Sequence, residues 1–337
     1  MSKQETTLPR PFASGESGED RPAIVVSGPT ASGKSALALA IAQSFDGVVI
    51  NADALQVYRE LSILTARPDA GATSLAPHRL YGFLPADERC SAARWRRLAL
   101  SEIAAAHAAG KLPVLCGGTG FYIKALEEGL AEIPEIPSDV LARGEALLAA
   151  QGVEGLRAAM LERDPDLAAR VGARDKQRLL RAWSVQEATG RSLTDWQRGP
   201  AAPDGAAALR CLHLVLLPPR AALDAAIAAR FRAMLAAGAL EEARHMAALG
   251  LDPSLPACKA LGLPELARHL AGELDLEAAT QGAIEATRRY AKRQGTWLRG
   301  QVIGQKKSVK LLNAQFSESD LEEFFPIIRQ FLLTVPA

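Results

Sequence analysis

A glycine-rich stretch near the N-terminus has the residue types and spacing of a loop that binds phosphate. Eight consecutive residues fit the pattern GxxxxGK[ST]: Gly28, Pro29, Thr30, Ala31, Ser32, Gly33, Lys34 and Ser35. In such a loop the backbone N–H groups hold phosphate oxygens, the lysine adds a positive charge and the serine hydroxyl is a Mg²⁺ ligand. We therefore expect a phosphate site here, with Ser35 as the metal ligand; the alternative is a chance turn. The pattern does not show that the phosphate belongs to ATP.

A carboxylate follows the second apolar run of the sequence. Residues 51–56 read Asn-Ala-Asp-Ala-Leu-Gln and come directly after Val48-Val49-Ile50. Ligands of open α/β sheets bind beyond the carboxyl ends of the strands, which would bring Asp53 close to the phosphate loop. Asp53 is thus a candidate general base or metal contact. A turn-forming or helix-capping aspartate is the alternative.

Glycines and one hydroxyl follow the third apolar run, in Gly117-Gly118-Thr119-Gly120. Many nucleotidases with a phosphate loop carry an Mg²⁺-binding aspartate at the end of a core strand, and this sequence has none there. Glycines allow the backbone to approach a ligand closely, and Thr119 is a candidate donor to a phosphate. The alternative is a plain glycine-rich turn.

Arg230 lies at the edge of an apolar stripe. In the helix expected over residues 221–237, the stripe consists of Leu223, Ile227, Phe231 and Met234. An arginine in that position faces the core or a cleft and needs an anionic partner. A structural salt bridge is the alternative.

Basic residues are clustered near position 290. Arg288, Arg289, Lys292 and Arg293 form i, i+4 pairs on one helix, and Gln294, Trp297 and Arg299 continue the stripe. Basic groups interleaved with aromatic rings suit a nucleic-acid backbone and a stacked base, although a solvated helix face is the usual meaning of such a run. Two weaker clusters are Gln177, Arg178 and Arg181, and Arg94-Trp95-Arg96-Arg97.

The elements that must position these residues alternate between strand and helix. Apolar strands are predicted at 23–26, 47–50, 114–116 and 212–217, and helices at 35–44 and 101–109. This order predicts an α/β fold with a P-loop-like parallel sheet that helices cover on both faces.

The chain changes character between residues 138 and 201, where strand signals vanish and Ala, Leu, Arg and Glu dominate. We predict a helical insertion at 138–201 within a core formed by 21–137 and 202–300, whose C-terminal part is helical. Residues 1–20 are predicted to be a disordered tail, and residues 301–337 are assigned only as a C-terminal tail.

Composition limits the remaining possibilities. The 337 residues carry a net charge of +1, so any basic surface for nucleic acid must be local. No apolar run of membrane-spanning length occurs, and the polar N-terminus does not read as a signal peptide. The four cysteines are far apart and form no CxxC pair, so neither a zinc site nor a disulfide framework is expected. We expect a cytoplasmic protein.

Several segments together resemble the tRNA dimethylallyltransferase family (tRNA isopentenyltransferases), from about residue 24 to 299. They are GPTASGKS at 28–35, NADALQVYREL at 51–61, GGTGFYIKAL at 117–126, DKQR at 175–178 and KRQGTWLRG at 292–300. Four positions depart from the family pattern: Asn51, Ala54, Leu64 and Leu263.

The resemblance implies transfer of a dimethylallyl group from dimethylallyl diphosphate to N6 of adenosine 37, beside the tRNA anticodon. It implies Asp53 as general base, with Lys34, Thr119, Arg230, the loop amides and Mg²⁺ stabilising the leaving diphosphate. A monomer is expected. The implied tRNA-binding residues are Asp53, Ala54, Leu55, Gln56, Thr119, Gln177, Arg178, Arg181, Arg289, Lys292, Arg293, Gln294, Trp297 and Arg299.

Two other functions stay open at this point. An ATP-dependent small-molecule kinase would explain the phosphate loop, but not the glycines at 117–118 or the basic stripe. An RNA-binding module with a vestigial phosphate loop would explain the stripe, but not the intact Lys34, Ser35 and Asp53.

Overall fold

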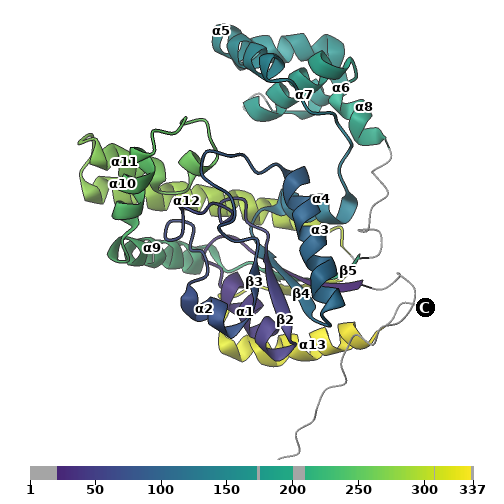
Figure 1. The fold of residues 1–337 in the computed structure, drawn as a ribbon, viewed down its shortest axis with the longest axis vertical. Helices are drawn as coiled ribbons and strands as arrows, with labels where there is room; N and C mark the ends of the chain where they lie inside the picture. Colours follow the sequence, from purple (N-terminus) through teal and green to yellow (C-terminus); the bar gives the residue numbers. More distant parts are fainter. Residues whose placement is uncertain (1–20, 173–174, 200–208, 307, 335–337) are drawn as a thin grey trace, which may run out of the picture. The chain divides into compact units, whose positions relative to one another are not determined.

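The computed structural model describes residues 21–172, 175–199, 209–306 and 308–334. The chain divides into two compact units: Met1–Glu127 with Gly205–Ala337, and Glu128–Asp204 (Figure 1). Residues 1–20, for which the sequence predicts disorder, lie outside the described part. No helix in the described part is long and apolar enough to cross a membrane.

The first unit is built on a parallel sheet of six strands in the order β3-β2-β4-β1-β5-β6. The α/β class and the parallel sheet predicted from the sequence are thus confirmed. Two strands escaped prediction, because β3 has only two residues and β6 only four. The strands are β1 (Arg21–Ser27), β2 (Gly47–Asn51), β3 (His78–Arg79), β4 (Leu112–Gly117), β5 (Leu209–Leu216) and β6 (Val309–Leu312).

Helices cover both faces of this sheet because alternate strand residues point to opposite sides. In β1, Ile24 and Val26 pack on the face covered by α1 and α13. Ala23 and Val25 pack on the other face, against α3 and α4. The helices of the unit are α1 (Lys34–Ser44), α2 (Ala70–Leu75), α3 (Ala92–Ala108), α4 (Gly120–Glu128), α9 (Arg220–Ala236), α10 (Ala239–Ala248), α11 (Leu263–Leu270), α12 (Leu276–Leu298) and α13 (Leu321–Leu333).

Helix α3 begins nine residues before the start predicted from the sequence. Ser91 is its N-cap, and its Oγ accepts a hydrogen bond from the Arg94 backbone N–H at 3.1 Å. The segment 94–97, considered as a basic cluster, is therefore the first turns of this helix. Its Trp95 is fully buried and its Arg96 is buried, donating to the Ala125 carbonyl at 2.6 Å.

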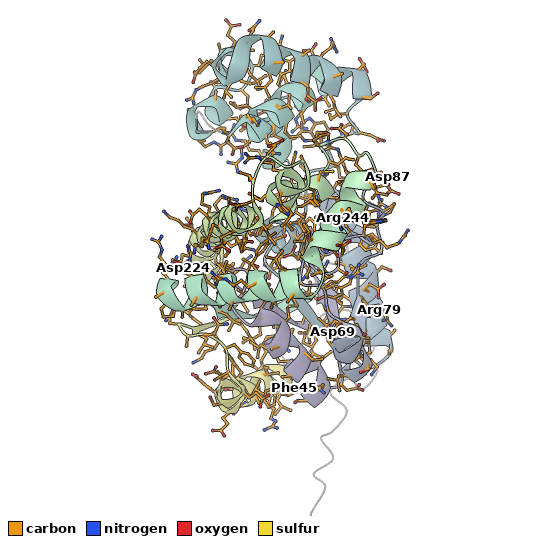
Figure 2. All side chains as sticks on the ribbon, turned by 90° about the vertical axis from the view of Figure 1, so that its left-hand side faces the viewer. Phe45, Asp69, Arg79, Asp87, Asp224 and Arg244 are labelled. Atoms are coloured by element: carbon orange, nitrogen blue, oxygen red, sulfur yellow. The ribbon has the colours of Figure 1, made fainter. Side chains whose placement is uncertain are left out.

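The C-terminal residues, which the sequence left without a placement, complete the core. Strand β6 pairs with β5, and α13 buries Phe324 and Ile328 fully against α1 and the sheet. Phe45, which follows α1 and is labelled in Figure 2, meets Phe325 edge to face, with ring centroids 5.3 Å apart. A four-residue edge strand and a helix that contains Pro326 give weak sequence signals, which explains why both were missed.

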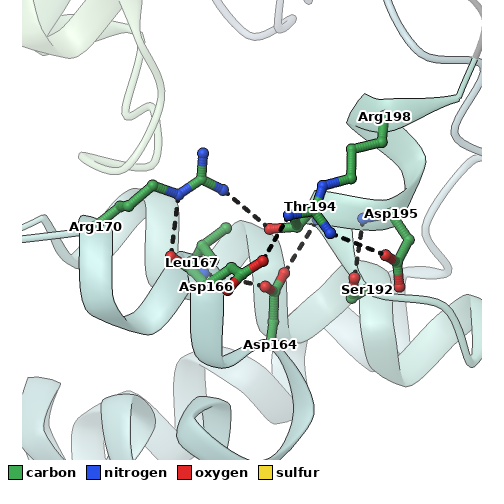
Figure 3. Close-up of polar contacts among 8 residues, drawn as sticks. All are labelled: Asp164, Asp166, Leu167, Arg170, Ser192, Thr194, Asp195 and Arg198. Atoms are coloured by element: carbon green, nitrogen blue, oxygen red, sulfur yellow. Dashed lines mark hydrogen bonds and ion pairs between the residues drawn. The ribbon is translucent and has the colours of Figure 1, made fainter.

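The second unit is all-helical in its described residues and has its own core, with Leu156, Met160, Leu179 and Trp183 among the buried side chains. Asp164 ties two helices together, since its carboxylate accepts from the N–H groups of Leu167 and Thr194, each at 3.1 Å (Figure 3). Its helices are α5 (Ser138–Arg163), α6 (Pro165–Arg170), α7 (Lys176–Thr189) and α8 (Leu193–Arg198).

Candidate active site

The phosphate loop connects β1 to α1, in the strand–loop–helix context that the pattern requires. Its geometry needs residues that tolerate left-handed backbone: φ is 65° at Ala31 and 92° at Gly33. Gly28 has no room for a side chain, since a Cβ there would stand 2.5 Å from Ser32 Oγ and 2.9 Å from the Leu216 carbonyl oxygen.

Lys34 is buried at the start of α1, and its Nζ donates a hydrogen bond to the Pro29 carbonyl oxygen at 3.4 Å. Burial lowers the pKa of Lys34, while the nearby Asp53 carboxylate acts in the opposite direction. A cation that is held away from water in this way interacts strongly with any anion that enters the loop.

Asp53 lies in a turn beyond β2 that is fixed by side chains. Asn51 Oδ1 accepts from the Asp53 N–H at 2.8 Å, and Asn51 Nδ2 donates to the Leu80 carbonyl at 2.9 Å. The Asp53 carboxylate in turn accepts from the Leu55 N–H at 3.0 Å through Oδ1. Asp53 therefore has the turn-forming role considered from the sequence, and it also lines the cavity described below.

Thr119 holds this turn from the neighbouring strand end. Its Oγ1 accepts from the Ala54 N–H at 2.9 Å, and its own N–H donates to the Ala52 carbonyl at 3.2 Å. The Thr119 and Gln294 side chains lie near the hydroxyl of Tyr290, which lines the same cavity as Asp53. Burial raises the pKa of Tyr290, and the Asp53 charge raises it further, so this phenol stays neutral.

Arg230 reaches the phosphate loop from α9. Its guanidinium donates a hydrogen bond to Thr30 Oγ1, while Ile227 and Phe231 beside it are buried in the core. Burial lowers the pKa of Arg230 and the Asp53 carboxylate raises it, although a guanidinium remains charged in both cases. Because Arg230 lies at the edge of the apolar stripe, its guanidinium reaches Thr30 of the phosphate loop.

Asp53, Arg230 and Tyr290 line one cavity together with Thr30 of the phosphate loop. Thr65 and Thr287 add two further hydroxyl groups to its polar lining. Six apolar side chains complete much of the wall: Leu55, Leu64, Ile227, Phe231, Met234 and Leu261. The cavity thus combines a cationic edge at Arg230, one carboxylate and an apolar wall.

The wall segment around Leu64 is fixed by a buried carboxylate from α10. Glu242 Oε1 accepts from the N–H groups of Ser62 and Ile63 at 2.6 and 2.8 Å, and Oε2 accepts from the Leu64 N–H at 2.8 Å. Ser62 Oγ donates to the same carboxylate at 3.0 Å. Sequence reasoning missed Glu242, because its partners are about 180 residues away in the chain.

Gln294 does not face outward as the basic stripe suggested. It is buried; its Oε1 accepts from the Thr30 N–H at 2.8 Å and its Nε2 donates to the Gly118 carbonyl at 3.0 Å. Trp297 also turns inward, since a Cβ added to Gly120 would stand 2.1 Å from its ring. Both ends of the Gln294 amide thus have a partner within the protein, and its contact with tRNA stays a prediction.

Gln56 also has partners within the protein. Its side-chain Nε2 donates to the carbonyls of Thr65 and Ala66, each at 2.9 Å, next to the wall segment that Glu242 holds, and its contact with tRNA stays a prediction. Hydrogen bonds thus join the segments that the sequence singled out: Thr119 to Ala54, and Gln294 to both Thr30 and Gly118.

The rest of the basic stripe faces solvent. Lys292, Arg293 and Arg299 are exposed, and Arg293 lies over the Tyr290 ring, 5.5 Å from its centroid. Arg289 is exposed and pairs with Glu285 at 3.5 Å, whereas Arg288 lies 3.7 Å from Asp224 of α9. In the second unit Gln177, Arg178 and Arg181 are exposed on α7.

A metal site made only of protein groups is absent from the described residues, where no cluster of three His, Cys, Asp or Glu could hold an ion. Mg²⁺ usually binds through one or two protein oxygens together with phosphate oxygens and water. Ser35 is exposed at the start of α1, beside Lys34, and so offers a hydroxyl of the kind required.

Comparisons with known proteins agree with this arrangement. The IPP transferase family model matches residues 56–301, and the isopentenyl transferase model matches residues 22–81. The tRNA dimethylallyltransferase of Rhodospirillum centenum is 57% identical over 85% of this chain and 91% of its own length. That of Paramagnetospirillum magneticum is 53% identical over 94% of this chain and 98% of its own.

Solved structures show the same fold. The tRNA isopentenylpyrophosphate transferase of Bacillus halodurans is 28% identical, with a TM-score of 0.65, over 93% of this chain and 97% of that one. A eukaryotic dimethylallyltransferase acting on tRNA gives a TM-score of 0.81 at 24% identity, over 94% of this chain and 81% of that one, which is a likeness of fold. By sequence and structure, the chain belongs to the IPP transferase family.

Proposed function

We propose that this protein transfers the dimethylallyl group of dimethylallyl diphosphate to N6 of adenosine 37 in tRNA. One observation carries the proposal: Asp53, Arg230 and the phosphate-loop residue Thr30 line the same cavity as a set of apolar side chains. This reaction must bring together three groups: the diphosphate anion, the five-carbon allyl group and the adenine N6 amine, which has to lose a proton. The relatives named above point to the same activity.

In the proposed reaction, N6 attacks C1 of the allyl group as the bond from C1 to the diphosphate oxygen breaks. N6 is a weak nucleophile because its lone pair is delocalised into the ring, and it must lose a proton. Asp53 accepts that proton. The turn around Asn51 and Thr119 keeps the carboxylate in place, so we assign Thr119 a positioning role besides its expected contact with phosphate.

Diphosphate leaves with negative charge growing on its oxygens. Lys34 and Arg230 supply two partly desolvated cations, and the amides of residues 28–35 that are free of internal bonds supply donors. When bound through Ser35 and the diphosphate, Mg²⁺ would neutralise further charge on the leaving group. The apolar wall around Leu64 and Phe231 receives the dimethylallyl group and excludes water from it.

Adenosine 37 must leave its base stack to reach the site, at a cost of roughly a few kcal/mol. Contacts between the protein and the RNA backbone must offset this cost. We propose that the exposed Arg289, Lys292, Arg293 and Arg299 bind phosphates of the anticodon stem-loop. The exposed Gln177, Arg178 and Arg181 of the second unit would add to this contact. With tRNA as its substrate, the protein would act in the cytoplasm, as a monomer.

A small-molecule kinase is the less supported alternative. Strand β4 ends in Cys116 and Gly117, so no carboxylate stands where many nucleotidases bind Mg²⁺. Burial raises the pKa of Cys116 to about 11, which keeps its thiol neutral beside Lys34.

A single-turnover assay tests the proposal. Wild-type protein with Mg²⁺ and labelled dimethylallyl diphosphate should label an unmodified tRNA transcript, but not a transcript in which adenosine 37 is replaced by guanosine. Lys34→Ala should abolish transfer and leave the Kd for tRNA nearly unchanged, because the loop serves the diphosphate. ATP turnover without transfer, or normal transfer by Lys34→Ala at saturating diphosphate, would refute the assignment.

A further inference from the structure

The connection between β6 and α13 touches the phosphate loop. Gln315 Nε2 donates a hydrogen bond to the Ala31 carbonyl at 2.9 Å, across 284 residues of sequence. Phe316 packs beside Gly33, since its Cβ lies 2.8 Å from where a Cβ on that glycine would stand. The family model ends at residue 301, so this contact comes from a part of the chain that it does not describe.

The two contacted residues are the ones that give the loop its shape. Ala31 and Gly33 both have left-handed backbone, with φ of 65° and 92°. Glycine adopts this conformation freely, but alanine does so only where the surroundings hold it. Ala31 is the non-glycine residue of the loop that has left-handed backbone, and its carbonyl is the group that accepts the hydrogen bond from Gln315.

The segment that carries Gln315 and Phe316 is anchored at both ends. Before it, Leu311 and Leu312 pair in register with Val215 and Leu216 of β5. After it, α13 is pinned by the buried Phe324, and Arg210 of β5 donates to the Phe331 carbonyl at 2.7 Å. Leu216 also contacts the position of Gly28, so the strand that anchors the segment adjoins the loop as well.

We propose that residues 313–316 are a positioning element of the diphosphate site, in which Gln315 and Phe316 hold the phosphate loop in its anion-binding conformation. Neither residue touches the substrate; both act through Ala31 and Gly33. The inference rests on the assignment of residues 28–35 to diphosphate. Without the segment, the loop would have to become ordered on binding, and the cost of that ordering would weaken its affinity for the anion.

Variants of Gln315 test this directly. Gln315→Met keeps the length of the side chain and removes the donor, while Gln315→Glu places a carboxylate against the Ala31 carbonyl. Gln330→Met, at an exposed glutamine of α13, is the matched control. The Kd of inorganic pyrophosphate with Mg²⁺ is measured by calorimetry, together with kcat, the KM for dimethylallyl diphosphate, the Kd for tRNA and the Tm.

We expect Gln315→Met to raise the pyrophosphate Kd and the KM by about 3–10-fold, the usual range for loss of one hydrogen bond, and Gln315→Glu to raise them at least as much. The control, the Tm and the tRNA Kd should stay near wild type. Amide hydrogen exchange in residues 28–35 should accelerate in the Gln315 variants but not in Gln330→Met, which a merely structural role in α13 would not produce. Phe316→Ala should act in the same direction.

Two results separate the possible failures. If Lys34→Ala also leaves pyrophosphate binding intact, the assignment of the loop to diphosphate is wrong. If Lys34→Ala abolishes binding but both Gln315 variants bind pyrophosphate within about twofold of wild type, the loop assignment stands and the positioning role is refuted, since the expected loss is larger.

Discussion

The side-chain amide of Gln294 connects two loops of the site: its Oε1 accepts the Thr30 N–H at 2.8 Å, and its Nε2 donates to the Gly118 carbonyl at 3.0 Å. One residue of α12 thereby fixes the phosphate loop relative to the strand end that carries Thr119. The Thr30 N–H is consequently occupied, and diphosphate must be held by the other amides of the loop, by Lys34 and by Arg230.

Gln294→Met should separate this role from RNA binding. The variant keeps the packing volume but loses both hydrogen bonds and leaves the Thr30 N–H unpaired, so kcat/KM for dimethylallyl diphosphate should fall by roughly 10–100-fold. The Kd for tRNA should change little. Gln281→Met, at an exposed glutamine of the same helix, is the control. A loss confined to tRNA affinity would instead support the RNA contact predicted from the sequence.

Asp53→Asn tests the general base. Asparagine keeps the size of the side chain and retains an oxygen that can accept from the Leu55 N–H, so the turn should survive. The single-turnover rate constant should fall by roughly 10²–10⁴, the usual contribution of general-base catalysis, with little change in tRNA affinity.

Other outcomes for Asp53 have distinct signatures. Partial recovery with extra Mg²⁺, or weaker diphosphate binding, would identify Asp53 as a metal contact. A shifted Tm with a rate within about threefold of wild type would leave it only its structural role in the turn, because loss of a base costs far more.

The double variant Arg289→Ala/Arg293→Ala tests the exposed stripe. Each lost phosphate contact should lower the slope of log K against log salt by about 0.7–0.9, so tRNA should bind more weakly and with a flatter salt dependence. Fluorescence anisotropy at several salt concentrations measures both quantities. Arg244→Ala, at an exposed arginine of α10 (Figure 2), controls for net charge. An unchanged slope would mean that the stripe is a solvated helix face.

Glu127 should make folding sensitive to acid. Burial alone would raise its pKa, but the hydrogen bond from His213 Nε2 at 2.7 Å and the charge of Lys306 outweigh burial, and the pKa of Glu127 is lowered. A depressed carboxylate pKa stabilises the fold above the unfolded value near 4.3, and this stability is lost as pH falls through the lower folded value.

Glu127→Gln should therefore lower the free energy of unfolding at pH 7 by about 1.5–3 kcal/mol, the range for a charge-assisted hydrogen bond. The difference from wild type should shrink as pH drops below about 4.3, where the carboxylate of the unfolded chain becomes protonated, and should disappear once pH is below the lowered pKa of the folded state. Urea denaturation at a series of pH values measures both, with Glu162→Gln, at an exposed residue, as control. A difference that is independent of pH would show that the charge of Glu127 does not matter.

The sequence by itself determined the local parts of this protein. The pattern of residues 28–35, the carboxylate at Asp53 and the stripe that places Arg230 beside a cleft depend on near neighbours, and the alternation of strand and helix depends on hydrophobic period. These features specified a parallel α/β core and the phosphate loop. A helical insertion at 138–201 was predicted in the same way, from a stretch without strand signals.

Only the tertiary structure decided how distant residues combine. The sequence pattern predicts Gln294 and Gln56 only as tRNA contacts, yet in the folded chain both side chains donate to backbone carbonyls. Glu242 and Gln315 gave no signal, because their partners lie about 180 and 284 residues away and are set by how helices and strands stack. A hydrogen bond between distant segments depends on angstrom-scale placement that no local pattern encodes, and the cavity beside Asp53 is built from such contacts.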